Sequence, residues 1–150
     1  MTKHDSLTLS LLNQVGVGYI KQEKADSALI YLEQALPLAQ KLRQQSILGT
    51  LFNNLGAAFK LQHNWSQAQD YLYRSVSHNR AVQGDSAAML AYSYFHLAGV
   101  HLAQSHADSA RIYAQKSLGL ATHHELSELQ EEIKSLMGQL EQVSANKPEY

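Results

Sequence analysis

The stretch Gly49–Val76, GTLFNNLGAAFKLQHNWSQAQDYLYRSV, predicts two amphipathic helices separated by a short polar break. The first half places four residues on one helical face through i, i+3, i+4, i+7 spacing: Phe52, Leu55, Gly56 and Phe59. Asn64, at the end of the break, is well placed to cap the second helix. The second half also has one packing face: Ala68, Tyr71, Leu72, Ser75 and Val76. Small residues on both faces predict a closely packed antiparallel pair.

The same pattern recurs on both sides of this stretch. Aligned on the small residue of the second helix, Ala28, Ala68 and Ala110 are 40 and 42 residues apart. Three further columns keep this register: Gly16, Gly56 and Ala98; Tyr19, Phe59 and His101; Leu32, Leu72 and Ala114. A recurring period of this size predicts an array of helical repeats.

The pattern resembles the tetratricopeptide repeat family over roughly residues 9 to 122. The resemblance rests on the columns above, together with the residue pairs Val15-Gly16, Leu55-Gly56 and Leu97-Ala98. The period exceeds the usual family length of about 34 residues, so the chain looks like the long-unit type. The turn glycine usual in the family is replaced by Glu23, His63 and Ser105. The resemblance implies an all-α solenoid.

We expect one domain over residues 1–150, built from three helix-turn-helix repeats and a C-terminal helix. The expected repeats cover about 6–44, 46–82 and 86–121, and the last helix about 125–143. Leu7, Leu11 and Val15 are expected to face inward from the first helix. The last helix has two interpretations: it caps the third repeat, or it is the first helix of a fourth repeat whose partner helix is missing.

Composition excludes several classes of function. The formal net charge is −1, from 12 basic and 13 acidic residues, and no basic stripe points to nucleic acid or an anionic membrane. There is no cysteine, which excludes disulfides and cysteine-based metal or redox sites. The N-terminal stretch lacks the apolar core of a signal peptide, and no run is long enough for a membrane span. We therefore expect a cytoplasmic location.

No catalytic, metal or cofactor site is expected. The eight histidines include no i, i+4 pair that would put two ligands on one helix face. His101 takes the place of a packed ring residue, and we expect it to be buried. There is no G-x-S-x-G motif and no glycine-rich phosphate loop. The serines occur at helix starts or in small packing columns, so the chain is not expected to be an enzyme.

In the tetratricopeptide family, the first helix of each repeat lines a concave groove, and the resemblance carries this role to nine residues here. They are Asn13, Gln14, Lys21, Asn53, Asn54, Lys60, Tyr92, Phe95 and His96. Asparagine offers a donor and an acceptor at one tip, which suits an extended peptide backbone. The alternative for Asn53 and Asn54 is that they tie neighbouring helices together.

The groove residues do not fit the carboxylate clamp of the chaperone-tail binders in this family. That clamp uses two lysines, an arginine and two asparagines. At the matching positions stand Asn13, Val17, Asn54, Tyr92 and His96, of which only Asn54 fits. A co-chaperone role of this kind is therefore not expected.

The resemblance implies a non-catalytic module that binds a protein or an extended peptide, within a bacterial regulator or sensor. The alternative is a structural module that forms homo-oligomers through the apolar face of its C-terminal helix. That face carries Leu129, Ile133, Leu136, Leu140 and Val143.

Overall fold

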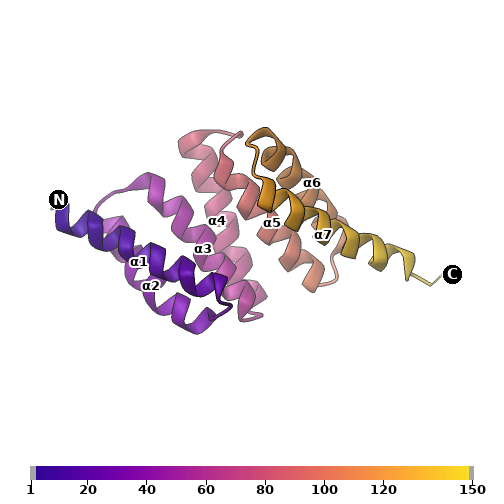
Figure 1. The fold of residues 1–150 in the computed structure, drawn as a ribbon, viewed down its shortest axis with the longest axis horizontal. Coiled ribbons are helices and arrows are strands. Elements are labelled where there is room, and N and C mark those ends of the chain that lie inside the picture. The colour runs from indigo at the N-terminus through magenta and orange to yellow at the C-terminus, as the bar shows by residue number, and fades with distance from the viewer. Residues whose placement is uncertain (1–2, 149–150) are drawn as a thin grey trace.

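The computed structural model describes residues 3–148 and folds them into seven α-helices, with no strand in that range. The helices are α1 (Lys3–Lys21), α2 (Ala25–Lys41), α3 (Gln45–Leu61), α4 (Trp65–Gln83), α5 (Ala88–Ala103), α6 (Ala107–His123) and α7 (Ser127–Ala145). Figure 1 shows an elongated array with α1 at one end and α7 near the other. The predicted all-α solenoid is confirmed, and the three predicted helix pairs correspond to α1–α2, α3–α4 and α5–α6.

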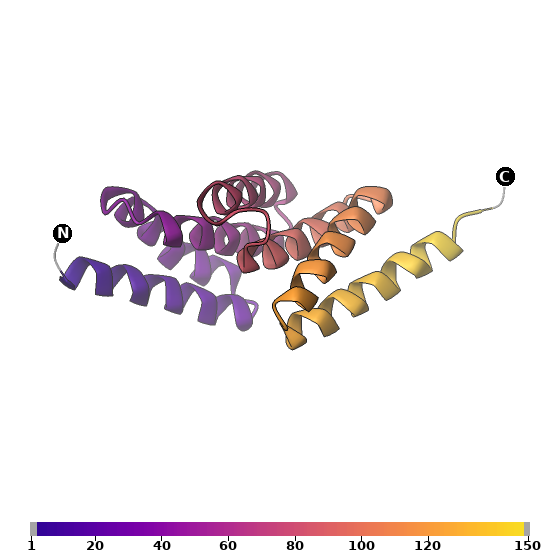
Figure 2. The same ribbon diagram turned by 90° about the horizontal axis from the view of Figure 1, so that it is seen from above.

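The array is curved, with the first helices of the repeats on its inner side. α1 contacts α3, α3 contacts α5, and α5 contacts α7, whereas α2, α4 and α6 contact only their neighbours in sequence. Because the second helices are spread apart, α1, α3, α5 and α7 form the concave face. Figure 2 shows the resulting arch, with α1 and α7 at its two ends.

Within each repeat, the two helices fit together through paired side-chain sizes. A Cβ added at Gly16 would lie 2.6 Å from Leu32 Cγ, and one added at Gly56 would lie 2.6 Å from Leu72 Cγ. In the third repeat the same positions hold Ala98 and Ala114, both fully buried. A glycine therefore faces a leucine in two repeats, and an alanine faces an alanine in the third.

A stacked ring pair closes the turn end of each repeat. In each repeat, a ring residue of the first helix stacks on a tyrosine of the second helix, and the ring centroids are 5.6, 5.6 and 5.3 Å apart in the first, second and third repeats. The pairs are Tyr19–Tyr31, Phe59–Tyr71 and His101–Tyr113. These aromatic contacts repeat with the sequence period and support the alignment of the three repeats.

Five of the turns end a helix in the same way, with a left-handed residue that is not glycine. The φ angles lie between 52° and 63° at Glu23, Arg43, His63, Ser105 and Glu125. At Glu23, for example, the backbone N–H donates to Ile20 O, and the next N–H, of Lys24, donates to Tyr19 O. This is the hydrogen-bond pattern of a Schellman motif, which usually has glycine at the left-handed position.

Because of these turns, some helices end at other residues than the sequence predicts. Asn64 accepts a hydrogen bond from the Gln67 N–H at 3.3 Å, so the predicted cap of α4 is confirmed. The second helix ends at Lys41 rather than residue 44, because Arg43 is left-handed. Thr122 and Glu125 have the spacing of a capping box, from which the sequence predicts the start of the last helix. This prediction is wrong, since Thr122 belongs to α6 and Glu125 is the left-handed turn residue.

The start of α1 and the cap of α5 also differ from the prediction. α1 begins at Lys3 rather than at Ser6; residues 1–2 and 149–150 of the predicted domain lie outside the described residues. The sequence predicts Asp85 or Ser86 as the cap of α5. That prediction is wrong, because the residue that precedes α5 is Ala87 and no side chain caps the helix.

One face of α1 is apolar and exposed, contrary to the prediction. Leu7, Leu11 and Val15 are 59%, 51% and 40% exposed. The equivalent Leu51 and Leu55 in α3 are fully buried, in one apolar cluster with residues of α2. α1 has no preceding helix in the described chain, so its equivalent face, here named the α1 stripe, is left uncovered.

The C-terminal helix α7 presents the opposite character. Its apolar residues Leu129, Ile133, Leu136 and Leu140 are buried in clusters with residues of α5 and α6, whereas Glu128, Glu131, Lys134 and Glu141 are exposed. A polar outer face is typical of a capping helix. The apolar face proposed for self-association is thus largely covered within the chain itself.

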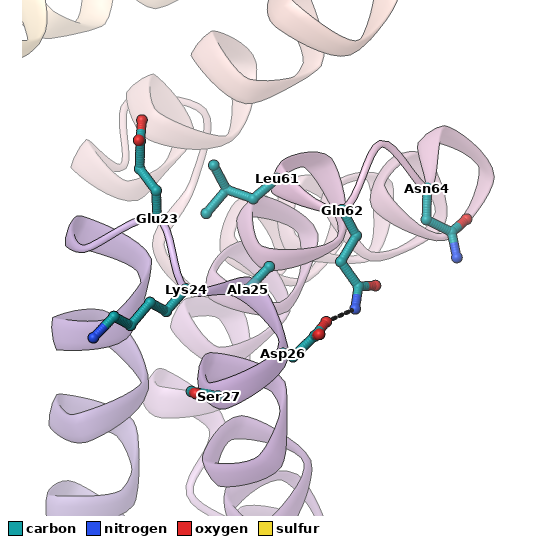
Figure 3. A pocket seen from close by; sticks show the side chains of 8 residues that line it. All are labelled: Glu23, Lys24, Ala25, Asp26, Ser27, Leu61, Gln62 and Asn64. Atoms are coloured by element: carbon teal, nitrogen blue, oxygen red, sulfur yellow. Dashed lines mark hydrogen bonds between the residues drawn. The ribbon is translucent and has the colours of Figure 1, made fainter.

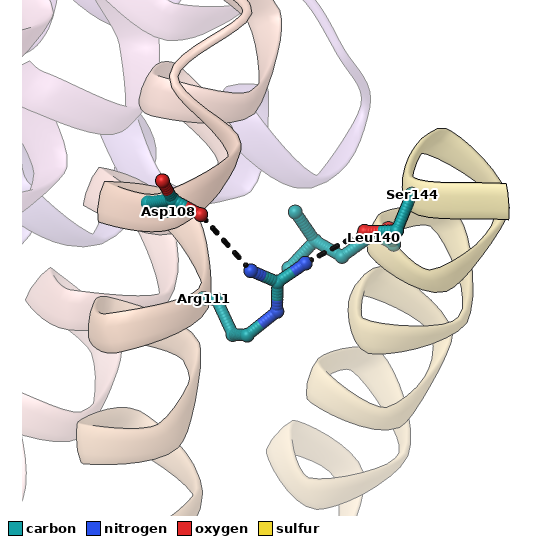
Figure 4. Close-up of polar contacts among 4 residues, drawn as sticks. All are labelled: Asp108, Arg111, Leu140 and Ser144. Atoms are coloured by element: carbon teal, nitrogen blue, oxygen red, sulfur yellow. Dashed lines mark hydrogen bonds and ion pairs between the residues drawn. The ribbon is translucent and has the colours of Figure 1, made fainter. Parts of the chain in front are cut away.

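Polar contacts also hold the last turn of α7 to α6. Arg111 lies between the two helices, as Figure 4 shows, with Nη1 3.2 Å from Asp108 Oδ1 and Nη2 2.8 Å from Ser144 Oγ. Ser144 Oγ in turn donates to Leu140 O. The guanidinium thereby links the first turn of α6 to the last turn of α7.

His101 is buried as expected, and its environment predicts a loss of stability in acid. Its side chain is 7% exposed, Nε2 lies 3.1 Å from Tyr73 Oη, and Nδ1 is buried with no hydrogen-bond partner. Burial, and then the charge of His106, lower the pKa of His101 below 6.5. Protonation would create a buried charge whose Nδ1–H has no acceptor.

Because this pKa is lowered on folding, the stability it contributes is present above pH 6.5 and is lost as pH falls through the folded-state value. We expect the unfolding free energy to fall between pH 7 and pH 5, at up to about 1.4 kcal/mol per pH unit. His101→Phe, which copies the ring of the second repeat, is expected to reduce this slope in chemical-denaturation curves; the part due to His96, whose pKa burial also lowers, remains. An equal slope in the variant would contradict the assignment.

Candidate functional site

A pocket on the concave face is the candidate binding site, and it lies where α3, α5 and α7 meet. Its volume is about 520 Å³. One cationic side chain, aromatic and aliphatic walls and several polar tips line it: Lys60, Phe95, Gly99, Leu102, Ala103, Glu132, Ser135, Leu136 and Gln139. We name this cavity the lysine pocket.

Lys60 is the chemical centre of the lysine pocket. Its Nζ lies 5.0 Å from the centroid of the Phe95 ring, over its face, and 3.5 Å from His96 Nδ1. A Cβ at Gly99 would lie 2.8 Å from the same Nζ, so glycine leaves the space that the lysine tip occupies. Among the described residues, Lys60 forms no ion pair. The cation is therefore held by the ring, by His96 Nδ1 and by the shape of the cavity, without an ion pair within residues 3–148.

Burial lowers the pKa of Lys60 from its ordinary value, and the negative charge of Glu132 partly opposes that shift. The pKa of His96 is lowered well below 6.5, first by burial and then by the charge of Lys60. His96 is therefore neutral at physiological pH. Since an ammonium group can only donate, His96 Nδ1 is the acceptor in this contact. The site thus presents one desolvated positive charge.

The predicted asparagines form a ladder of hydrogen bonds that crosses all three repeats. Asn54 Nδ2 donates to Asn13 Oδ1 at 2.9 Å, and Asn53 Nδ2 lies 3.5 Å from Asn54 Oδ1. Ser93 Oγ lies 3.0 Å from Asn53 Oδ1 and 2.9 Å from Ser75 Oγ. Asn53 and Asn54 are only 5% and 9% exposed. This geometry supports the alternative interpretation, in which the two asparagines tie neighbouring helices together.

The structure brings together three of the nine predicted groove residues: Lys60 contacts both Phe95 and His96, and Lys60 and Phe95 line the lysine pocket. Gln14 is exposed on α1 and donates to Ser10, Lys21 is exposed at the end of α1, and Tyr92 is 36% exposed near the start of α5. None of these three lines the lysine pocket.

The pocket residues of α7 were missed by the sequence reasoning, although a signal for them exists. Gly138 follows Ala98 by 40 residues, in the register of the first-helix column. The same shift of 40 residues aligns Ser135 with Phe95 and Gln139 with Gly99 in the repeat. All four residues line the pocket. α7 therefore supplies the fourth wall of the concave face while its outer side closes the array.

A larger hollow, about 740 Å³, lies at the turns of the first two repeats. Figure 3 shows the side chains of Asp26 and Gln62, whose Nε2–Oδ1 hydrogen bond of 2.6 Å links the two turns. Lys24 points away from this pair. The hollow lacks an aromatic wall and an unpaired buried charge, so we place the candidate site at the lysine pocket.

Within residues 3–148, no three histidine or carboxylate side chains gather as metal ligands. No helix in the same range has the length and apolar character needed to cross a membrane.

Comparison with known proteins identifies the repeat type. The sequence has no match among curated proteins. The structure is similar to the crystal structure of BtubC (BKLC) from P. vanneervenii, with a TM-score of 0.70 and 14% identity over 97% of this chain and 68% of that chain. At this identity the similarity concerns the fold alone. A family model described as tetratricopeptide repeat matches residues 46–123, and repeats of this family generally mediate protein–protein interactions without catalysis. More than half of the chain thus carries the family pattern, and the chain belongs to the tetratricopeptide repeat family.

Proposed function

We propose that the concave face of this chain binds an extended segment of a partner protein, with the lysine pocket as the anchor point. The observation that carries the proposal is the combination found there: an unpaired, desolvated lysine between the apolar walls of α5 and α7. Concave pockets with mostly apolar walls and a few placed polar groups are typical binding sites. The role is recognition without chemistry, as one module of a regulator or sensor.

The asparagine ladder supports this role indirectly. A binding groove loses less entropy on association when its walls are already rigid. Buried and part-buried hydrogen bonds from Asn13 through Asn54 and Asn53 to Ser93 connect the inner helices of all three repeats. The relative positions of α3 and α5, and with them Lys60 and Phe95, are therefore fixed before a ligand arrives.

The test uses a displayed library of random 12-residue peptides selected against the full chain. Ser135 is exposed and lines the pocket, so Ser135→Tyr fills the cavity without removing a core side chain. We expect this variant to weaken the selected peptides at least tenfold, measured by fluorescence anisotropy. The matched control is Ser77→Tyr, the same change at an exposed position of α4 on the outer side of the array.

Equal binding by wild type and Ser135→Tyr would place the ligand elsewhere, and enrichment of no peptide would contradict the proposal for extended segments.

Homo-oligomer formation is the second candidate, and the α1 stripe is the apolar surface that favours it, since the inner side of α7 is occupied. Sedimentation of the unliganded protein over a range of concentrations distinguishes the two. A constant monomer mass would contradict self-association.

A further inference from the structure

Lys60 is a largely desolvated cation that forms no ion pair among the described residues. Its tip lies over the Phe95 ring and against Gly99. Burying a charge costs free energy unless the charge is paired or hydrogen-bonded. The contact with His96 Nδ1 at 3.5 Å and the ring contact with Phe95 offset part of that cost. An incoming anion would offset much more.

We infer that the lysine pocket takes the side-chain carboxylate of an aspartate or glutamate inside the bound segment, with apolar residues of the segment on either side of it. This inference rests on the function proposed above and names the chemistry that its anchor point selects. The carboxylate would accept a charge-assisted hydrogen bond from Lys60 Nζ, and such bonds are about twice as strong as neutral ones. The flanking residues would contact Phe95 on α5 and Leu136 on α7.

The charges around the pocket favour a single carboxylate over a phosphate. Glu132 also lines the cavity, so a dianion at Lys60 would meet a negative charge as well as the one cation. Phosphate recognition usually uses arginine clusters, and no arginine lines this cavity. An internal residue is favoured over a chain terminus because the apolar walls come from two helices, and only a segment that continues on both sides of the acid can use both.

The experiment compares matched peptides on the full chain. A peptide selected from the library is synthesised with an amidated C-terminus, both as selected and with its acidic residue changed to the corresponding amide. On the wild-type protein we expect the amide peptide to bind at least tenfold more weakly. On Lys60→Met, which keeps the apolar stem, we expect the acidic and amide peptides to bind equally.

Glu132 supplies a test in the opposite direction. Glu132→Gln removes the competing negative charge and is expected to tighten binding of the acidic peptide about threefold at low ionic strength, with a smaller effect in high salt. The matched control is Glu131→Gln, a neighbouring exposed glutamate that pairs with Lys134 and does not line the pocket. Both variants change exposed side chains of α7, so they are expected to fold as the wild type does.

The outcomes separate this inference from the proposed function. If Ser135→Tyr abolishes binding but the acidic and amide peptides bind the wild-type protein equally, the groove stands and the carboxylate inference is overturned. If affinity depends on a free C-terminus rather than on the internal acid, the carboxylate comes from a chain end and the inference is equally wrong. If Ser135→Tyr, Lys60→Met and Glu132→Gln all bind as the wild type does, both the inference and the groove fail.

Discussion

Replacing Gly56 with alanine is expected to lower the free energy of unfolding by about 1–3 kcal/mol, the usual cost of overpacking a close contact. The new Cβ would lie 2.6 Å from Leu72 Cγ and 3.2 Å from the backbone carbonyl oxygen of Ala68. The leucine is fully buried, and the carbonyl belongs to a helix backbone, so neither moves without shifting α4. Chemical denaturation followed by circular dichroism measures the change.

The double variant Gly56→Ala/Leu72→Ala tests whether the two side chains are matched in size. Leu72→Ala alone is expected to cost about 2–5 kcal/mol, because it leaves a cavity. Together the two changes reproduce the Ala98–Ala114 pair of the third repeat, so the combined loss is expected to be smaller than the sum by about 1 kcal/mol or more. Simple additivity would show that the two residues do not share one contact.

Gly18→Ala is the control for helix propensity. Gly18 also lies within a helix, but a Cβ there would have no neighbour within 4 Å. An alanine at this position is expected to stabilise the protein by about 0.5–1 kcal/mol. The same chemical change thus has opposite signs at positions 18 and 56, and equal effects would contradict the packing argument.

Glycine at all five left-handed turn positions is expected to raise the unfolding free energy by about 3–5 kcal/mol in total. A side chain in the left-handed region costs roughly 1–2 kcal/mol, and the greater freedom of glycine in the unfolded chain removes part of the gain. The positions are Glu23, Arg43, His63, Ser105 and Glu125. The backbone hydrogen bonds of these turns need no side chain and are expected to persist.

For a chain of this size, that gain corresponds to a rise in melting temperature of about 10 °C, measured by thermal denaturation. His63 is expected to contribute least, because its ring also contacts Trp65 at a centroid distance of 5.1 Å. Gly84 is the opposing control: at φ 85° and ψ 180° it occupies a region open essentially to glycine alone, and Gly84→Ala is expected to destabilise. An unchanged melting temperature in the fivefold variant would mean that the side chains at these turns make compensating contacts.

Much of the fold was predictable because the contacts within a repeat depend on neighbouring positions and recur with the period. The Gly56–Leu72 contact and the Phe59–Tyr71 stack lie within one helix pair, and all four residues belong to the two packing faces that the sequence predicts. The helix ends were less predictable. Arg43 and Glu125 form turns that usually contain glycine, and nothing in their side chains indicates this. The prediction that Leu11 is buried was wrong, because its burial requires a preceding helix, and the pattern of one helix does not show whether such a neighbour exists.

The candidate site was only partly predictable, because it depends on contacts between repeats. The inward positions of α3 and α5 follow from the family pattern, and Phe95 and His96 both contact Lys60, which lines the lysine pocket. The angle between successive repeats decides which inward residues are covered. That angle buries Asn53 and Asn54 in hydrogen bonds and brings Glu132 of α7 to the rim of the pocket.

The α1 stripe has a consequence for building longer arrays from this chain. The stripe is equivalent to the surface with which α3 packs against α2, so a grafted helix pair resembling α3–α4 would find a ready-made contact surface before α1. At the opposite end, Glu128, Glu131 and Glu141 would first have to be exchanged for apolar residues. The array can therefore be extended before α1 without further changes, whereas extension after α7 first requires substitutions on that helix.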